Sequence, residues 1–426
     1  MSVVDEGHPA PQILTESAAE GWLPHICFAN GPPGRVGVEL EQVLLSAGPA
    51  PGAVPRARHQ AVLADVAAAG LVSRLTVEPG GQLELSGPPC AGLAEALAVM
   101  DDDLALLRRC AARRGVRATG VGLDPWSPPR RLLRQPRYEA MEAYFDGTGR
   151  AGRLMMCSTA SVQVSVEAGA GPQDPAGVLA RRWDVLHGVG PALVAAFANS
   201  PLHEGRPTGW ASTRTAVWAA LDAARTRAPA RRPGESLAEA YVRWALDAPL
   251  MMVRRDTGSW TAPDGVTFRQ WLRHGADVVA GRPGPTPDDL GYHLTTLFPP
   301  VRARGHLEVR YVDAQPGPWW QVPVAVLSTL ADDVRAADEA LAACEPTASR
   351  WLDAARQGLR DNDLYRAAVQ VLDVTARRLS AATSTRPAAA LVEQYLDRWT
   401  LRRRSPGDDL LDAAGSGRRS VVGGRS

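Results

Sequence analysis

Two patterns of hydrophobic and polar residues occur along this chain. In the first, apolar and polar residues alternate with a period of two, which is typical of β-strands with one buried face. It predicts strands at residues 35–45, 74–85 (two strands joined by a turn at 79–81), 115–123, 153–167 and 306–312. In the second, apolar residues recur at intervals of three and four, which predicts helices. These lie at residues 58–70, 92–114, 137–146, 176–199, 212–226, 236–247 and 266–280.

The order of these elements indicates an α+β fold. The strands do not alternate regularly with helices, and their period of two favours an antiparallel sheet with one polar face. From residue 323 to about 398 the pattern is almost wholly helical. We therefore expect an irregular N-terminal segment at 1–33, one large domain at 34–401 whose part from about 323 is helical, and a disordered tail at 402–426.

Polar positions on two of the predicted strands carry charged residues at short spacing. Residues two apart share a face of a strand, so Glu39 and Glu41 would lie side by side, as would Glu308 and Arg310. Carboxylates on one face repel one another unless a cation lies between them, and Mg²⁺ or Mn²⁺ prefers such oxygen ligands. A plainer explanation is open for each pair: Glu39 and Glu41 could form a solvated strand edge, and Glu308 and Arg310 a simple ion pair.

Glu78 and Glu84 extend the acidic pattern across the turn at 79–81. They would share a face in an extended chain, whereas a tight hairpin could separate them. The two adjacent glycines of the turn permit a positive φ or the close approach of a ligand, but an ordinary hairpin accounts for them equally well. Gln163 lies on the more polar face of the predicted strand 153–167. We therefore expect Gln163 to face whatever the sheet binds.

Composition narrows the possible partners. The formal net charge of +1 gives no general attraction to nucleic acid or to an anionic membrane. All 47 residues in the Lys+Arg total are arginine, so a phosphate group would have to be bound by Arg or by a metal ion. The five cysteines are widely spaced and include no Cys-x-x-Cys pair, which argues against disulfides and a zinc site. The chain has no apolar run of membrane-spanning length, so we expect a cytoplasmic protein.

Several motifs occur in an order that resembles a known family. They are Gly37-Val-Glu-Leu-Glu41, Glu78-Pro-Gly-Gly-Gln-Leu-Glu84-Leu-Ser86, Met155-Met-Cys-Ser-Thr-Ala-Ser-Val-Gln163-Val164, Pro207-Thr-Gly-Trp210-Ala-Ser-Thr-Arg214, Ala245-Leu-Asp-Ala-Pro-Leu-Met-Met252, and the run from His293 to Arg302 and on through Glu308-Val-Arg310. The set resembles glutamate–cysteine ligases of the plant-type family. It is more closely similar to the actinobacterial members that make γ-glutamylcysteine for ergothioneine biosynthesis. The resemblance covers about residues 35–400.

The resemblance implies a glutamine-synthetase-like catalytic domain. In such a domain a curved antiparallel sheet, flanked by helices, forms a funnel in which ATP and glutamate meet several Mg²⁺ ions, with Mn²⁺ as a possible substitute. The implied metal ligands are Glu39, Glu41, Glu78, Glu84 and Glu308. Arg310, which would face the phosphate, forms the implied catalytic group with Glu78 and Glu308. The implied substrate contacts are Gln163, Arg214, Arg254 and Arg302.

The implied reaction joins the γ-carboxylate of L-glutamate to the amine of L-cysteine through γ-glutamyl phosphate. Two alternatives stay open: a ligase that joins glutamate to a different amine, and a non-catalytic nucleotide-binding regulator. We expect a monomer whose partners are the small molecules glutamate and cysteine, with no nucleic acid and no membrane.

Overall fold

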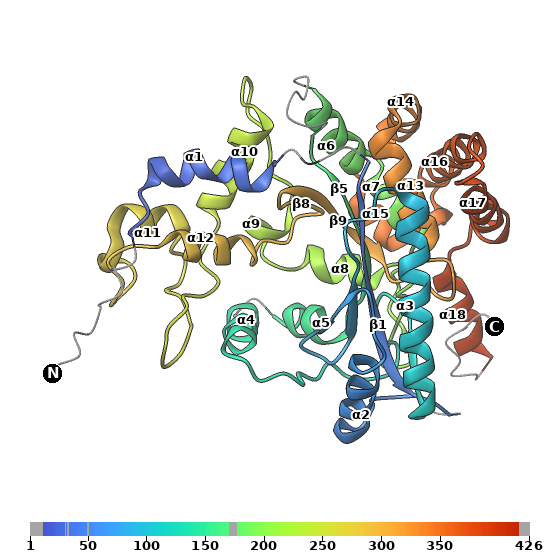
Figure 1. Ribbon diagram of the computed structural model, residues 1–426, viewed down its shortest axis with the longest axis horizontal. Coiled ribbons are helices and arrows are strands. Elements are labelled where there is room, and N and C mark those ends of the chain that lie inside the picture. The colour runs from blue at the N-terminus through green and yellow to red at the C-terminus, as the bar shows by residue number, and fades with distance from the viewer. Residues whose placement is uncertain are drawn as a thin grey trace.

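The centre of the molecule is a seven-stranded antiparallel sheet (Figure 1). The computed structural model describes residues 12–29, 31, 34–48, 51–147, 149–169 and 177–416. Six strands follow the order β2 (Arg74–Val77), β3 (Leu83–Ser86), β1 (Val36–Ser46), β5 (Ser161–Glu167), β9 (His306–Asp313) and β8 (Val301–Ala303). The seventh, β4 (Val116–Thr119), pairs with the C-terminal end of β1. A separate hairpin consists of β6 (Leu202–His203) and β7 (Arg206–Pro207).

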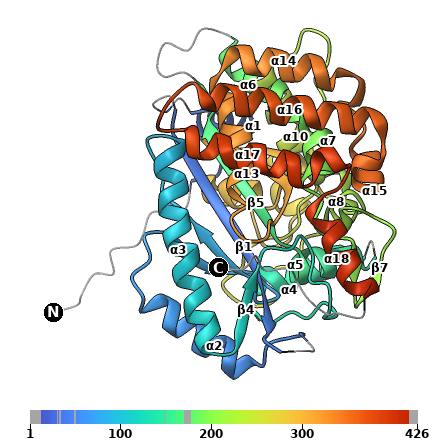
Figure 2. The ribbon, with the colours of Figure 1, turned by 90° about the vertical axis from the view of Figure 1, so that its right-hand side faces the viewer.

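One face of the sheet is apolar and belongs to the main core. Val38 and Leu40 of β1 and Val164 of β5 are at most 2% exposed. They belong to one hydrophobic cluster with residues of α3 (Leu93–Arg113) and α13 (Gln321–Asp332). Because side chains alternate along a strand, burying these positions turns the acidic positions of β1 to the other face. In both views α3 lies on one side of β1, and α4 (Pro136–Asp146) and α5 (Ala151–Ser158) lie on the other (Figure 2).

The remaining helices form two groups around the sheet (Figure 1). The first group is α1 (Glu16–Cys27), α8 (Thr213–Ala219), α9 (Ala223–Thr226), α10 (Leu237–Asp247), α11 (Phe268–His274), η1 (Gly275–Asp277) and α12 (Pro287–Leu294). The second is α6 (Val178–Gly188), α7 (Gly190–Ala196), α14 (Val334–Cys344), η2 (Glu345–Thr347), α15 (Trp351–Gln357), η3 (Gly358–Arg360), α16 (Asn362–Ser380), α17 (Arg386–Arg398), η4 (Thr400–Arg402) and α18 (Pro406–Gly415). Helix α2 (Arg56–Ala67) packs against α3. The predicted α+β class, with an antiparallel sheet flanked by helices and a helical C-terminal part, is confirmed.

The strand predicted over 153–167 is wrong in its first half. Residues 151–158 form α5, and the strand begins only at Ser161. The helix buries Met155 and Met156 in a cluster with Met141 and Phe145 of α4. Residues 151–158 are mostly apolar and small, so a period of two and a helical period describe them about equally well, and packing against α4 decides between the two.

Two segments expected to be irregular contain helices. Helix α1 lies within the predicted irregular segment 1–33, because Ala19, Leu23 and Cys27 recur every four residues and are buried on one face. Helix α18 lies within the predicted disordered tail 402–426. It begins with a capping box between Ser405 and Asp408 and buries part of its surface. The tail beyond residue 416 and the chain before residue 12 lie outside the described residues. Within the described ranges, no helix has both the length and the hydrophobicity needed to cross a bilayer.

Candidate active site

Strand register places the predicted acidic residues on one face of the sheet. Glu41 of β1 is directly opposite Glu84 of β3, and Glu39 is directly opposite Gln163 of β5. Glu308 of β9 is opposite Ser165, two residues farther along β5. Because residues directly opposite in an antiparallel pair point to the same face, these side chains line one polar surface.

The turn after β2 brings Glu78 to the same surface. The backbone amide of Glu78 donates to the carbonyl of Gln82 over 2.8 Å, which closes the hairpin, and Gly81 has a φ of +95° that favours glycine. The His59 ring contacts the backbone carbonyl of Gly81 at 2.7 Å, and the side-chain amide of Gln82 donates to the backbone carbonyl of Thr159 at 2.9 Å. The turn is therefore fixed from two sides. It leaves Glu78 beside Glu84 instead of separating them.

Glu41, Glu78 and Glu84 form a group that could hold a metal ion. One carboxylate oxygen from each lies within 4.8 Å of the others. Burial, and next the charge of Glu41, raise the pKa of Glu78 to about 8. Burial and next Glu308 raise the pKa of Glu39 to about 8, while burial and next Glu84 raise the pKa of Glu41. Several half-buried carboxylates without a cation resist ionisation, and a divalent cation with oxygen preference fits their charge and donor type.

Gln163 links the acidic group to Arg310. The side chain is 2% exposed. Its Nε2 donates to Glu41 at 3.1 Å, while its Oε1 accepts from Arg310 at 2.6 Å. The second oxygen of Glu41 accepts from the backbone amide and the hydroxyl of Ser161, at 2.6 and 2.9 Å. The Gln163 oxygen is thus engaged by a cation of the protein, so this geometry makes Gln163 a bridge between Glu41 and Arg310.

Glu308 lies between two guanidinium groups. Arg302 donates to both of its oxygens at 2.9 Å, and Arg310 also pairs with it. Burial raises the pKa of Glu308, but the two arginines outweigh burial and lower it to about 2. Three of the five predicted metal ligands, Glu41, Glu78 and Glu84, therefore lie together. Glu39 lies on the same face of the sheet, opposite Gln163, and the charge of Glu308 is already balanced by the two arginines.

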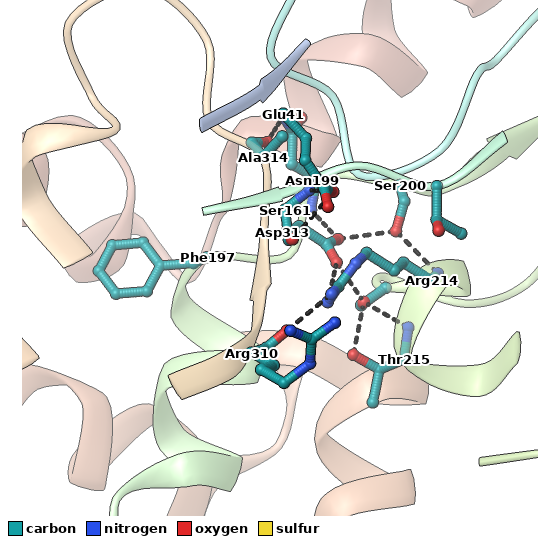
Figure 3. Close-up of polar contacts among 12 residues, drawn as sticks. Glu41, Ser161, Phe197, Asn199, Ser200, Arg214, Thr215, Arg310, Asp313 and Ala314 are labelled. Carbon is teal, nitrogen blue, oxygen red and sulfur yellow. Dashed lines mark hydrogen bonds and ion pairs between the residues drawn. The ribbon is translucent and has the colours of Figure 1, made fainter. Parts of the chain in front are cut away.

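The other two predicted arginines lie in different surroundings. Arg214 is buried, and its Nη2 donates to the backbone carbonyl of Arg310 at 2.6 Å (Figure 3). Arg254 is about one-third exposed. It pairs with Asp289 at 3.4 Å and lies over the ring of Tyr292, with its Cζ 4.7 Å from the ring centre.

Asp313 is a residue of this site that the sequence pattern does not reveal. It accepts from the backbone amide of Asn199 at 2.9 Å and from the Ser200 hydroxyl at 2.7 Å, and lies 4.0 Å from Arg214 (Figure 3). A period of two from Glu308 would place Asp313 on the apolar face. A β-bulge between β5 and β9 shifts the register, so that Asp313 pairs with Ser161 on the polar face. The available signal was an acidic residue directly after the apolar pair Tyr311 and Val312.

The chain is similar in sequence and in fold to known proteins. The sequence matches the model of glutamate-cysteine ligase family 2 over residues 35–422. It is 41% identical over 418 residues to the glutamate–cysteine ligase EgtA of Mycolicibacterium smegmatis, covering 96% of this chain and 94% of the relative. It is 33% identical over 298 residues to the chloroplastic glutamate–cysteine ligase of Arabidopsis thaliana, covering 67% of this chain and 53% of the relative. Among solved structures, the glutamate–cysteine ligase of Francisella tularensis in complex with AMP has a similar fold. The TM-score is 0.52 at 13% identity, over 90% of this chain and 85% of the other.

Proposed function

The chain belongs to glutamate-cysteine ligase family 2, and from this premise we propose that it joins L-glutamate to L-cysteine in an ATP-dependent reaction. The bond forms between the γ-carboxyl carbon of glutamate and the amine of cysteine. The products are γ-glutamylcysteine, ADP and phosphate. The likeness to the mycobacterial ligases supports ergothioneine biosynthesis as the use of this product.

The observation that carries the proposal is the group of Glu41, Glu78 and Glu84 beside Arg310. A carboxylate is a poor acyl donor, so the γ-carboxylate first attacks the γ-phosphorus of ATP and ADP leaves. The cysteine amine then attacks the acyl phosphate and phosphate leaves. Phosphoryl transfer depends mainly on positioning and on neutralisation of charge. Three carboxylates suited to Mg²⁺, next to a fixed arginine, supply the groups for both.

The metal would be held by Glu41, Glu78 and Glu84, with Glu39 and Glu308 as the further predicted ligands. Mg²⁺, or Mn²⁺ in its place, would neutralise charge on the ATP phosphates when bound there. Arg310 would stabilise negative charge on the transferred phosphoryl group. Its guanidinium is held by Gln163 and by Glu308, so it needs little reorganisation when that charge develops.

The test is the identity of the product. Purified protein with glutamate, cysteine, ATP and Mg²⁺ should yield γ-glutamylcysteine by mass spectrometry, with one ADP and one phosphate for each molecule of product. Formation of ADP with a different amine, when cysteine is replaced by each other amino acid, would show a ligase of another specificity. Absence of any glutamate-dependent ADP release would contradict the ligase function and favour a regulator.

A further inference from the structure

A small cavity adjoins the turn between β2 and β3. It measures about 70 Å³ and is lined by Gly80, Gly81 and Gln82 of the turn, by the beginning of α2, by the loop 124–132 and by the end of α5. Neither Arg310 nor any of the five predicted metal ligands lines it. The volume exceeds the roughly 10–15 Å³ that one water molecule needs, but is far below the roughly 300–1,000 Å³ of sites for larger ligands. A ligand of this cavity therefore has only a few atoms.

Two arginines from separate elements line the cavity without a counter-ion. Arg56 lies in the first turn of α2, and Arg130 lies in the loop 124–132. Both are exposed, and neither forms an ion pair or a side-chain hydrogen bond with any residue that the structure describes. One such arginine is an ordinary surface feature. Two that meet at one cavity offer it guanidinium groups, which bind oxyanions.

The beginning of α2 adds further positive charge. This helix of 12 residues has no side-chain cap at Pro55 and no acidic residue in its first turn, which instead contains Arg56 and Arg58. The first backbone amides of a helix have no partner within the helix, and its dipole is positive at this end. The two arginines add to that positive charge, so a bound anion would compensate both the arginines and the dipole.

Buried acceptors line the same cavity. Gln82 is 4% exposed, and its Nε2 donates to the backbone carbonyl of Thr159, whereas its Oε1 has no partner among the described residues. Asp124 is 9% exposed, and its Oδ1 accepts from the backbone amides of Trp126 and Ser127, at 2.9 and 3.0 Å. A buried acceptor without a donor is unfavourable. The ligand must therefore bring a donor to Gln82 as well as negative charge to the arginines.

We propose that this cavity binds hydrogen phosphate. Its oxygens would accept from Arg56, Arg130 and the first amides of α2, and its hydroxyl would donate to Oε1 of Gln82. Inorganic phosphate retains at least one hydroxyl at neutral pH, whereas sulfate has none, so the buried acceptors would select phosphate. Asp124 adds to this selection, because its carboxylate repels an anion that has no proton to share. The site is separate from the carboxylate group, and its ligand would contact the opposite end of the turn from Glu78.

Pairs of arginines provide a matched test. Arg58 and Arg134 are exposed and unpaired among the described residues, like Arg56 and Arg130, but do not line the cavity. Titration calorimetry with inorganic phosphate, in EDTA and without nucleotide, should show binding to wild type. We expect Arg56→Ala and Arg130→Ala each to weaken it at least about fivefold. At physiological ionic strength, Arg58→Ala and Arg134→Ala should stay within about twofold of wild type.

Sulfate tests the role of the acceptors. It should bind at least about tenfold more weakly than phosphate, because it cannot donate to Gln82. Equal affinity for the two anions would overturn the proposal, as would a lack of phosphate binding to wild type. Unchanged phosphate affinity in both cavity variants would place the anion elsewhere and also overturn it.

The two cavity variants change exposed residues on different elements, so each can be read if the other fails to fold, and circular dichroism checks both. No substrate or nucleotide is present in these titrations. A negative result would therefore leave the proposed ligase function untouched, and loss of that function would leave this inference standing.

Discussion

At the scale of single residues, we expect Glu78 to support catalysis and to lower the stability of the metal-free protein. Its carboxylate lies within 4.8 Å of Glu41 and Glu84, and burial raises its pKa to about 8. Glu78→Gln keeps the shape and removes a buried carboxyl group that, without metal, must either take up a proton or carry a charge repelled by Glu41. We expect kcat to fall on the order of 10²–10³-fold, because the bound metal ion would lose one charged oxygen ligand. We also expect the metal-free variant to melt about 1–3 °C higher than wild type. ADP release and thermal unfolding in EDTA measure the two effects.

The control for this variant is Glu142→Gln. Glu142 lies on α4 and forms an ion pair with Arg131 at 2.9 Å. It is not part of the group formed by Glu41, Glu78 and Glu84. It should keep activity close to wild type. Wild-type activity in Glu78→Gln would contradict a catalytic role for that carboxylate, and a lower melting temperature in EDTA would show that the three charges do not repel as their distances indicate.

Periodicity predicts some of these residues and misses others for a definable reason. The shared face of Glu39 and Glu41 follows directly from the period of two in a regular strand. The position of Glu78 does not, because it depends on how His59 and Thr159 fix a turn from distant parts of the chain. Asp313 is missed because a bulge changes the period within β9.

At the scale of elements, the turn between β2 and β3 positions Glu78 through a glycine. A Cβ on Gly80 would overlap the backbone carbonyl oxygen of Cys157, at the end of α5. Gly80→Ala should therefore displace the turn and lower kcat at least about tenfold. Gly21→Ala is the matched control, since open space surrounds Gly21 in α1. It should retain activity and gain roughly 0.5–1 kcal/mol of stability. Equal kcat in the two variants would show that the turn does not position Glu78.

The bulge in β9 is the second element on which the site depends. At the bulge, Arg310 and Tyr311 both lie opposite Gln163. The backbone carbonyl of Arg310 accepts a hydrogen bond from the side chain of Arg214. Arg214 in turn lies 4.0 Å from the carboxylate of Asp313. Asp313→Asn leaves Arg214 buried without its counter-charge, at a cost of about 3 kcal/mol in stability. We expect kcat to fall about tenfold with the KM for glutamate nearly unchanged, because Arg310 acts on charge in the transition state.

Ser212→Ala separates this effect from general loosening. The Ser212 hydroxyl donates to Asp313 at 3.0 Å but carries no charge. Its removal should cost about 1 kcal/mol and leave kcat close to wild type. If Asp313→Asn changed only stability, with kcat intact, Asp313 would have a purely structural role.

Hydrophobic periodicity predicts secondary structure correctly where one period is clear, and the prediction is wrong where two periods fit the same segment. Strand β1 and helix α3 lie within one or two residues of their predicted bounds, because the alternation in one and the apolar stripe in the other are long. Helix α5 has only eight residues, and its contacts with α4 decide its conformation. Helices α1 and α18 lie in segments that the sequence predicts as irregular, because proline and polar residues around them obscure short apolar stripes.

At the scale of the whole molecule, the sheet joins distant parts of the chain around one charge cluster. Glu41, Glu84, Gln163 and Arg310 come from β1, β3, β5 and β9, so the cluster exists only when the sheet is formed. A ligand that binds only the folded state stabilises it by an amount that grows with the ratio of its concentration to its Kd. Mg²⁺ should therefore raise the free energy of unfolding of the entire domain, by roughly 2.7 kcal/mol at a concentration of 100 Kd.

Urea unfolding in EDTA and in Mg²⁺ tests this coupling without any catalytic step. Wild type and Glu142→Gln should gain the full stabilisation, because their carboxylate groups are intact. Glu78→Gln should start from a higher stability in EDTA and gain much less from Mg²⁺, so that the order of the variants reverses between the two conditions. Equal gains in all three proteins would place the metal elsewhere. The reversal depends on one group serving both as a source of repulsion without metal and as a ligand with it, which neither a solvated strand edge nor a simple ion pair would produce.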